Sequence, residues 1–468
     1  MEESESTLED LSEENQVSSD PSIRNIWRIS FPLMISTLAF LLMIFVDRMF
    51  LSHYSLEALN ASVNAGTWAW AFMCGVGMLT AMSEVFVSQY NGAKKYHLIG
   101  KPVWQMVWIA FLSYLFFIPL SIWGGDILYY GSPYEHLEKT YFQILSLFAP
   151  CYALNTALSG FFVGRGKTRI LIWLAIGANI LNIGLDWMLI FGVEGLIAPM
   201  GVKGAAIATS MGYIFEVLVL WYIFLKRENR DKYQTHLYHL DRKEFTKCFR
   251  IGFPQAIFTT LEIVGFAIFY RMMTTLGEMH ITISGVCQSI LILLSFFFDG
   301  LSKGVAAVAG NFIGARKFDK IKQVLRSGVL LQLAFSTAVL LFFLFDLKFI
   351  FTSLFPSITE GRSPEEFARL YKSLTLCLYA TYFYITFEGI RWVLSGILTA
   401  AGDTYFLLLA GTLSVWLFLL VPIYFIVVKP GLSVEIAWSL TAIYSGLSCI
   451  VYWIRLQKGA WQEKDLLN

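Results

Sequence analysis

Charged residues are scarce in this 468-residue chain: they make up 15% of it, against 56% hydrophobic and 16% aromatic residues. This composition excludes a disordered protein and a nucleic-acid-binding domain, because both need many charged side chains. It also excludes a water-soluble enzyme, whose helices each require a polar face. The six cysteines form no CxxC pair and the six histidines no HExxH motif, so the sequence indicates neither a disulfide scaffold nor a zinc site.

The few charges leave long apolar stretches between them. Charge-free runs cover residues 29–46, 58–83, 102–125, 140–164, 279–298, 327–345, 404–428 and 436–454. Four more apolar stretches are interrupted only by Asp186, by Glu216, by Glu262, and by Glu388 with Arg391. Since roughly 20 residues cross the ~30 Å hydrocarbon core as a helix, the sequence predicts an all-α membrane protein with twelve transmembrane helices.

The charges that are present are distributed unevenly between the loops. If both termini are cytoplasmic, the cytoplasmic segments hold 24 of the 35 Lys and Arg residues and the external loops eight, which is the positive-inside bias of membrane proteins. The first 21 residues contain eight acids and neither Lys nor Arg, so they are neither a signal nor a transit peptide and are predicted to be disordered. We therefore expect a multi-pass protein of the cell membrane with both termini in the cytoplasm.

The two halves of the sequence repeat one another. Two motifs recur at an offset of 222 residues and two at an offset of 236: RISFP at 28–32 and RIGFP at 250–254, GAKK at 92–95 and GARK at 314–317, LSG at 158–160 and 394–396, and GKT at 166–168 and GDT at 402–404. Six spans per half is an even number, so both halves enter the membrane in the same direction. Parallel repeats related by an axis along the membrane normal predict a substrate path between the two halves.

The densest charge outside the spans lies between the halves, where residues 226–250 carry twelve charges. We therefore divide the chain into an acidic tail at 1–24, an N-lobe of spans 1–6 at 25–225, a cytoplasmic linker at 226–249, a C-lobe of spans 7–12 at 250–455 and a cytoplasmic C-terminal tail at 456–468. The chain is expected to act as a monomer in the lipid bilayer.

Four polar residues lie close together in depth within the first half. An ionisable group inside the membrane costs at least about 2.5–3.5 kcal/mol, so each one is a functional candidate. Counting about 1.5 Å per residue, Asp47, Asp186 and Thr209 lie roughly 6–9 Å below the outer surface, and Asn182 lies one turn deeper on the face of Asp186. Their oxygen atoms suit a bare Na⁺ or a shared proton. The alternatives are structural: Asp47 caps its helix, and Asn182 packs against a neighbouring helix.

A second set lies near the midplane of the other half. Glu262 and Glu388 are both roughly 15–18 Å deep at about 1.5 Å per residue, and Phe266 and Tyr270 follow Glu262 at one and two helical turns. A buried acid beside aromatic rings suits an organic cation, by Coulomb attraction and cation–π contact, or it carries a proton. The alternatives are that the rings only pack, and that Arg391, three residues after Glu388, pairs with it.

Two other features are interpreted as structural. Asp299 and Lys303 are four residues apart on one helical face and are predicted to form an ion pair. GRGKT at 164–168 resembles the end of a phosphate-binding loop, but the first glycine would fall on Phe161, and the segment is a basic turn between apolar spans. The sequence therefore indicates neither nucleotide binding nor enzymatic activity.

The chain resembles the multidrug and toxic compound extrusion (MATE) transporters over about residues 25–455. The resemblance is carried by a proline early in span 1, Asp47 late in it, Gln89 with GA at 92–93 closing span 2, NIGLD at 182–186, and GDT at 402–404. It implies a two-lobed antiporter that exports cationic or amphipathic organic compounds against a Na⁺ or H⁺ gradient, with no cofactor besides that coupling ion.

The resemblance also implies roles for individual residues of the first half. Asp47 matches the family's span 1 aspartate, Asn182 and Asp186 its span 5 pair, Thr209 its span 6 hydroxyl, and Asn155 a span 4 asparagine. These five are the expected cation- or proton-binding residues. Asp47, Asn182, Asp186 and Thr209 are the expected ligands if the ion is Na⁺.

In the second half, Glu262 matches the span 7 glutamate of the NorM-like and eukaryotic branches, with Phe266 one turn on. Glu388 occupies the span 10 acid position, where the NorM-like branch typically has Asp. Glu262, Phe266, Tyr270, Glu388 and Arg391 are the expected substrate- or proton-binding residues. An intact first-half cluster together with both second-half acids departs from either subfamily pattern, so the coupling ion and the half that binds it stay open.

We hypothesise a secondary active antiporter, which exports small organic cations in exchange for H⁺ or Na⁺ by alternating access of its two lobes. A lipid-linked oligosaccharide flippase of the same superfamily is the first alternative, and it predicts a cavity rich in Arg and Lys for pyrophosphate. A non-transporting membrane scaffold is the second, and it predicts that the intramembrane acids can be neutralised without effect.

Overall fold

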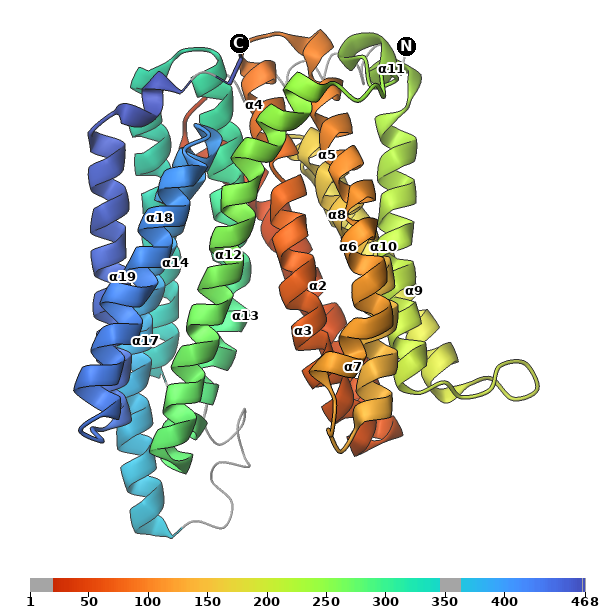
Figure 1. Ribbon diagram of the computed structural model, residues 1–468. Coiled ribbons are helices and arrows are strands. Elements are labelled where there is room, and N and C mark those ends of the chain that lie inside the picture. Colours follow the sequence, from red (N-terminus) through yellow and green to blue (C-terminus); the bar gives the residue numbers. More distant parts are fainter. Residues whose placement is uncertain (1–19, 346–362, 465, 468) are drawn as a thin grey trace.

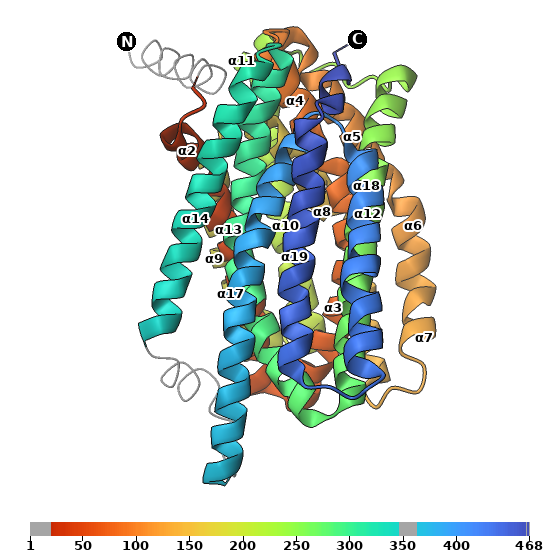
Figure 2. The ribbon, with the colours of Figure 1, turned by 90° about the vertical axis from the view of Figure 1, so that its left-hand side faces the viewer.

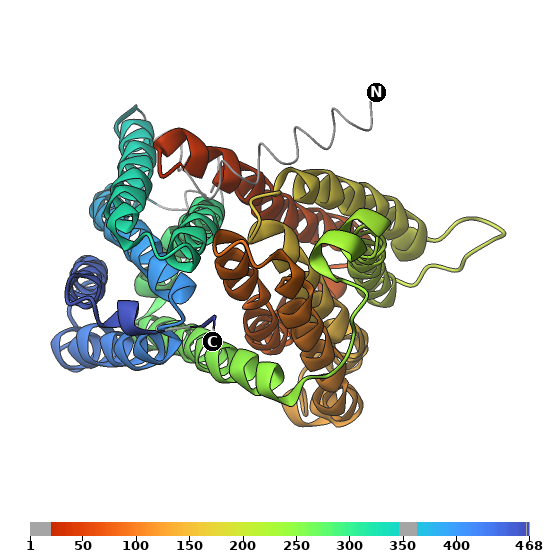
Figure 3. The same ribbon diagram turned by 90° about the horizontal axis from the view of Figure 1, so that it is seen from above.

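The long helices of the chain form two bundles. The computed structural model describes residues 20–345, 363–464 and 466–467, so most of the predicted acidic tail and the segment 346–362 lie outside the described residues. The helices up to α10 (Val202–Phe224) form one bundle, and those from α12 (Arg242–Leu276) onward form the other (Figure 1). Figure 3, which looks along the bundle axes, shows the two groups side by side. This arrangement confirms the predicted all-α fold.

All twelve predicted spans are present. The first half contains α2 (Ile23–Tyr54), α3 (Leu56–Thr80) with α4 (Ser83–Gly92), α5 (Gly100–Leu112) with α6 (Tyr114–Pro119) and α7 (Gly125–Leu128), α8 (Glu135–Val163), α9 (Arg169–Phe191) and α10. The second half contains α12, α13 (Glu278–Gly314), α14 (Ile321–Phe345), α17 (Pro364–Ala400), α18 (Thr404–Ser414) with two π-helical segments, and α19 (Val434–Gln457). Eleven of these spans are long and apolar enough to cross a membrane. The twelfth, α17, contains Glu388 and Arg391 and is not among these eleven.

At one end of the molecule lie α4, α11 (Arg227–Tyr233) and the C-terminal end of the chain, and the two bundles converge towards this end (Figure 1). Ser327 Oγ, near the start of α14, donates to the backbone oxygen of Pro21 (2.9 Å), so α2 also starts at this end. Figure 2 looks onto the second half, with α18 and α19 in front. We call the end of the molecule that contains α4, α11 and the C-terminal end of the chain the terminal end.

The backbone repeats as the sequence predicts. Lys94 and Arg316, which are 222 residues apart, adopt a left-handed conformation with φ of 58° and 56°, and this is uncommon for residues other than glycine. Each is followed two residues later by a short 3-10 turn. Gly166 and Gly402, which are 236 residues apart, have φ of 74° and 75°. The two halves therefore share local geometry as well as sequence.

Glycines at equivalent positions bring the two halves into close contact. A Cβ atom on Gly92 would lie 1.9 Å from the backbone oxygen of Asn311, and one on Gly314 would lie 2.0 Å from the backbone oxygen of Gln89. The two glycines, and the two residues that they contact, are related by the offset of 222. The contact is therefore two-fold symmetric, and no side chain larger than a hydrogen atom fits there.

Hydrogen bonds hold the same contact together. Gln89 Nε2 donates to the backbone oxygen of Ala400 (2.7 Å), and Asn91 Nδ2 donates to Asn311 Oδ1 (2.8 Å). Asn311 Nδ2 in turn donates to the backbone oxygen of Gly164 (2.9 Å). These groups are buried, so each needs a partner. The halves are therefore packed against each other at the terminal end.

The segment between the halves is fastened to the first one. Within the predicted linker 226–249, α11 is helical and α12 already begins at Arg242. Trp104 and Trp108 on α5 donate their indole N–H groups to the backbone oxygens of Thr235 (2.7 Å) and Tyr238 (2.9 Å). This connection fixes where the second half begins relative to the first.

We predict that Gly92→Ala shifts the protein towards a state in which the terminal end is open. The added methyl group overlaps the backbone of Asn311, and overpacking of this kind costs about 1–3 kcal/mol, which corresponds to a population change of about 5- to 150-fold. Spin labels at positions 97 and 319, which are equivalent in the two halves, would report a longer distance by electron–electron double resonance in a background without the native cysteines.

Gly184→Ala is the matched control for this prediction. A Cβ atom at Gly184 meets nothing within 4 Å, so this variant should keep the distance distribution of the parent protein. Identical distributions for Gly92→Ala and Gly184→Ala would show that the glycine contact does not determine closure.

Candidate functional site

Four of the predicted residues assemble in the first half. α2 supplies Asp47, α9 supplies Asn182 and Asp186 one helical turn apart, and α10 supplies Thr209. Their side chains are at most 7% exposed. We call these four residues the first-half cluster.

The two carboxylates of this cluster contact each other and share one amide donor. With its nitrogen turned towards them, Asn182 donates to Asp47 Oδ1 (3.0 Å) and to Asp186 Oδ2 (3.3 Å). Thr209 Oγ1 donates to Asp47 Oδ2 (2.9 Å). Asp186 Oδ1 is buried and makes no hydrogen bond within the described residues. Neither carboxylate has an ion-pair partner within the described residues, and a shared proton or a bound monovalent cation would neutralise one of the two charges.

Asn155 does not join this cluster in the structure. Its amide donates to Glu216 Oε2, and its oxygen accepts from Ser159 Oγ (2.9 Å). The predicted ion-binding role of Asn155 therefore has to be considered with Glu216, which sequence reasoning left without a function. The signal was present, since Glu216 is one of the few charges that interrupt a predicted span.

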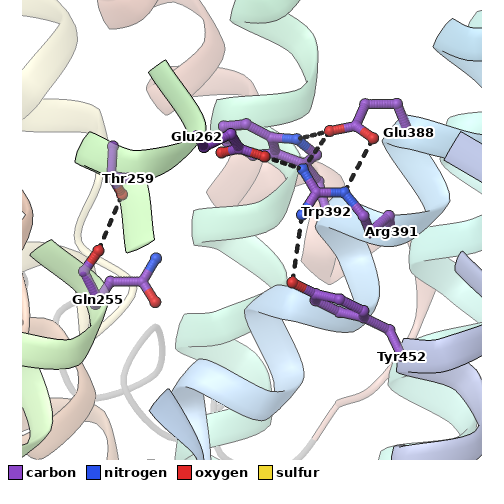
Figure 4. A network of polar contacts seen from close by, with 7 residues as sticks. All are labelled: Gln255, Thr259, Glu262, Glu388, Arg391, Trp392 and Tyr452. Carbon is purple, nitrogen blue, oxygen red and sulfur yellow. Dashed lines mark hydrogen bonds and ion pairs between the residues drawn. The ribbon is translucent and has the colours of Figure 1, made fainter. Parts of the chain in front are cut away.

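The second-half cluster is organised by one guanidinium group (Figure 4). Arg391 Nη2 donates to Glu262 Oε1 (2.8 Å) from α12, and Arg391 Nε donates to Glu388 Oε2 (2.9 Å) on its own helix α17. Arg391 Nη2 also pairs with Glu388 Oε1. Arg391 is 3% exposed. The expectation that Glu262 and Glu388 stand ready for an external cation is thus modified, because both already share an internal one.

Two further side chains complete this cluster, and the sequence did not indicate them. Trp392 Nε1 donates to Glu388 Oε1 (2.8 Å), and Tyr452 from α19 accepts from Arg391 Nη1 (3.4 Å) (Figure 4). Both are ordinary aromatic residues of apolar spans, so no local pattern distinguishes them. Their hydrogen bonds fix the orientation of the two charged groups that they contact.

The two predicted aromatic residues of α12 lie beside other rings. Phe266 packs edge-on against Tyr384, with ring centroids 6.5 Å apart. Tyr270 packs against Phe269, with centroids 5.2 Å apart. Neither ring lines the cavity described next, so a role for them in substrate binding stays a prediction.

A cavity lies between the two halves, lined by residues of α3 and α4 on one side and of α12, α13 and α17 on the other. We call it the interface cavity; its volume is about 100 Å³. Its ionisable lining residues are three acids and two bases: Glu84, Glu262, Asp299, Lys303 and Arg391. The predicted ion pair is present, since Lys303 Nζ lies 2.8 Å from Asp299 Oδ2. With every group in its ordinary charge state, the lining carries a net negative charge.

Asp403, in the GDT motif of the second half, is a structural residue at the terminal end. Its carboxylate pairs with Arg455 (2.8 Å) and Lys464 (2.9 Å), and its side chain is 1% exposed. Burial alone would raise the pKa of Asp403, but the hydrogen bonds from Arg455 and Lys464 hold the pKa below its usual range. These pairs attach the C-terminal segment to the turn between α17 and α18.

The chain is similar to members of one protein family. The sequence matches the MatE family model over residues 32–188 and 254–425. It is 22% identical to the uncharacterized transporter YisQ of Bacillus subtilis, over 95% of this chain and 92% of YisQ. It is 28% identical to the multidrug resistance protein NorM of Vibrio cholerae, over 62% of this chain and 64% of NorM.

Solved structures share the two-lobed fold. An outward-facing multidrug resistance MATE family transporter of the MOP superfamily superposes with a TM-score of 0.81 at 17% identity, over 96% of this chain and 99% of that one. A MOP superfamily transporter from Pyrococcus furiosus superposes with a TM-score of 0.77 at 19% identity, over 96% and 98% of the two chains.

We predict that Arg391→Met strongly destabilises the protein. The substitution leaves Glu262 and Glu388 buried without their shared counter-charge, and losing one partner of a buried ion pair costs about 3–5 kcal/mol. Thermal unfolding of the detergent-purified protein should therefore begin at a clearly lower temperature. Adding Glu388→Gln should recover part of the loss, because it removes one of the two stranded charges.

The matched control for Arg391→Met is Arg455→Met. Asp403 keeps Lys464 when Arg455 is removed, so this variant should lose less stability. Equal unfolding temperatures for the two variants would contradict the central position of Arg391.

Proposed function

Because this chain belongs to the MATE family of membrane transporters, we propose that it is a secondary active antiporter, which exports cationic or amphipathic organic compounds in exchange for H⁺ or Na⁺. The observation that carries the proposal is the separation of two kinds of charged site. The carboxylate pair Asp47 and Asp186 lies inside the first half, whereas the interface cavity lies between the halves. The first-half cluster suits an ion, and the interface cavity suits the charged group of an organic compound.

The coupling ion binds at the first-half cluster in this proposal. Neither Asp186, whose Oδ1 makes no hydrogen bond, nor Asp47 has an ion-pair partner within the described residues, so a positive charge is favoured between them. A proton on either carboxylate supplies that charge. Na⁺ supplies it as well, and Asn182 then turns its oxygen towards the ion as a further ligand. Both ions use the same residues, so gradient experiments decide between them.

Ion binding drives export if it changes the relative stability of two packings of the halves. The positive-inside bias assigns the terminal end to the cytoplasm, so the described state is closed on the cytoplasmic side. Ion binding at Asp47, Asn182 and Asp186 acts on α2 and α9, and α2 also contacts the second half, where Thr37 Oγ1 donates to Asp299 Oδ2 (2.8 Å). This contact connects the ion site to the wall of the interface cavity.

The flippase alternative receives less support from the same cavity. Recognition of a pyrophosphate needs an excess of Arg and Lys. The interface cavity has more acids than bases, and both bases are already paired, Lys303 with Asp299 and Arg391 with Glu262. The charge balance favours a cationic compound.

We predict that Asp186→Asn reduces gradient-driven efflux of ethidium from proteoliposomes at least ten-fold. The variant removes one of the two carboxylates whose shared charge binds the coupling ion. Asp126→Asn, which changes an exposed acid, should transport as the unmodified protein does. Normal gradient-driven efflux by Asp186→Asn would remove Asp186 from the mechanism.

A second experiment identifies the ion. Proteoliposomes are given a Na⁺ gradient at constant pH, or a pH gradient without Na⁺, and ethidium efflux is measured under each condition. We expect one of the two gradients to drive efflux, with ion flux in the opposite direction that requires ethidium. Efflux that is insensitive to both gradients would contradict antiport.

A further inference from the structure

Glu84 differs from the other acids of the interface cavity in having no hydrogen-bond or ion-pair partner among the described residues. It lies in the first turn of α4, directly after the break at Ala81 and Met82 that separates α4 from α3. Its side chain lines the cavity and is 9% exposed. Within the described residues Glu84 makes neither a hydrogen bond nor an ion pair, and Lys303 acts on it only through space.

The neighbouring acids already have ion-pair partners at short range. Asp299 is held by Lys303 (2.8 Å) and by the Thr37 hydroxyl (2.8 Å). Glu262 is held by Arg391 (2.8 Å). Among the acids that line the cavity, Glu84 is therefore the one that has neither a hydrogen bond nor an ion pair within the described residues, so its carboxylate is free to bind a ligand.

A second polar atom of the lining is also unengaged, and it too is a hydrogen-bond acceptor. Gln255 Oε1 is buried and accepts no hydrogen bond within the described part of the chain. Carboxylate and amide oxygens together match a group that carries both a positive charge and several N–H donors, as a protonated amine does. Phe258 and Trp392 also line the cavity, and aromatic rings attract cations and cover apolar carbon.

We infer that Glu84 is the carboxylate that recognises the exported compound, and that the recognised group is the ammonium head of a protonated amine. This inference rests on the proposed antiport function and names the charge that selects its substrate. A cavity of about 100 Å³ is smaller than the roughly 300–1,000 Å³ of sites for drug-sized ligands. The described closed state therefore holds the head group, and a larger body requires the halves to separate.

The repeat supports a specific role for this position. Residue 306 is the equivalent of Glu84 in the second half, at the offset of 222, and it is an alanine that lines the same cavity. The acid is therefore absent from the other copy of the scaffold, and the scaffold does not require it for packing.

The test measures binding of 2-phenylethylamine and of its neutral counterpart 2-phenylethanol to the full chain in nanodiscs by calorimetry. The unmodified protein should bind the amine and bind the alcohol much more weakly. Glu84→Gln should weaken amine binding at least ten-fold and leave alcohol binding unchanged, and Glu84→Asp should retain most of the affinity. Glu244→Gln is the matched control, because Glu244 is also 9% exposed but lies outside the cavity.

If Glu84→Gln folds poorly, a second variant that places the carboxylate at another position of the cavity still tests the proposal. In Glu84→Gln combined with Ala306→Glu, the carboxylate enters the same cavity from the facing helix α13, and amine binding should return. A folded double variant without amine binding would overturn the assignment.

The experiments distinguish a wrong role for Glu84 from a wrong assignment of the antiport function. If the unmodified protein binds the amine and exports ethidium but Glu84→Gln binds the amine equally well, the role of Glu84 is wrong and antiport stands. If the unmodified protein neither binds the amine nor exports ethidium, both proposals are overturned.

Discussion

A charged side chain inside the membrane is stable only beside a counter-charge or hydrogen-bond donors at short range, and this constraint determines where the polar residues of this protein lie. Arg391 satisfies it for Glu262 and Glu388, and Lys303 satisfies it for Asp299. Each of these acids therefore has a basic partner within its own half. The carboxylates of the first-half cluster and of Glu84 have no basic partner at short range. Binding of an ion or a substrate at these carboxylates therefore changes the free energy of the protein.

The scaffold is symmetric, but the charges on it are not. At the offset of 222, Asp47 in the first half corresponds to Phe269 in the second, and Glu262 in the second corresponds to Phe40 in the first. Within the fourth span of each half, Arg391 takes the place of Asn155 at the offset of 236. Duplication therefore supplied the two packed halves, and substitution at a few positions made one half suited to an ion and the interface suited to a cation. Packing residues such as Gly92 and Gly314 kept the symmetry, because the contact between the halves depends on it.

The sequence predicted those features that depend on chain-local or periodic patterns. Twelve spans follow from hydropathy, and the repeat follows from motifs such as RISFP and RIGFP, whose backbone consequences at Lys94 and Arg316 are visible in the structure. Assembly of Asp47 with Asn182 and Asp186 could also be anticipated, from depth along the helices and from the family resemblance. Which charged residues pair with one another could not be predicted. Whether Arg391 faces Glu262 depends on the rotation of α12 against α17. This rotation is set by packing between helices and cannot be read from the sequence of either helix.

The same distribution of contacts explains why one ion could move so large a structure. The ion pairs of Arg391 join α12 to α17 within the second half, so they stay intact when the halves rock against each other as rigid bodies. Motion changes contacts between the halves, among them the glycine packing of Gly92 and Gly314, several hydrogen bonds, and the bond from Thr37 to Asp299. Neutral hydrogen bonds contribute about 0.5–1.5 kcal/mol each, so the exchange of a few of them changes the relative free energy of the two states by a few kcal/mol. The binding energy of a single cation with unequal affinity for the two states is of the same size, and it is sufficient to reverse their populations.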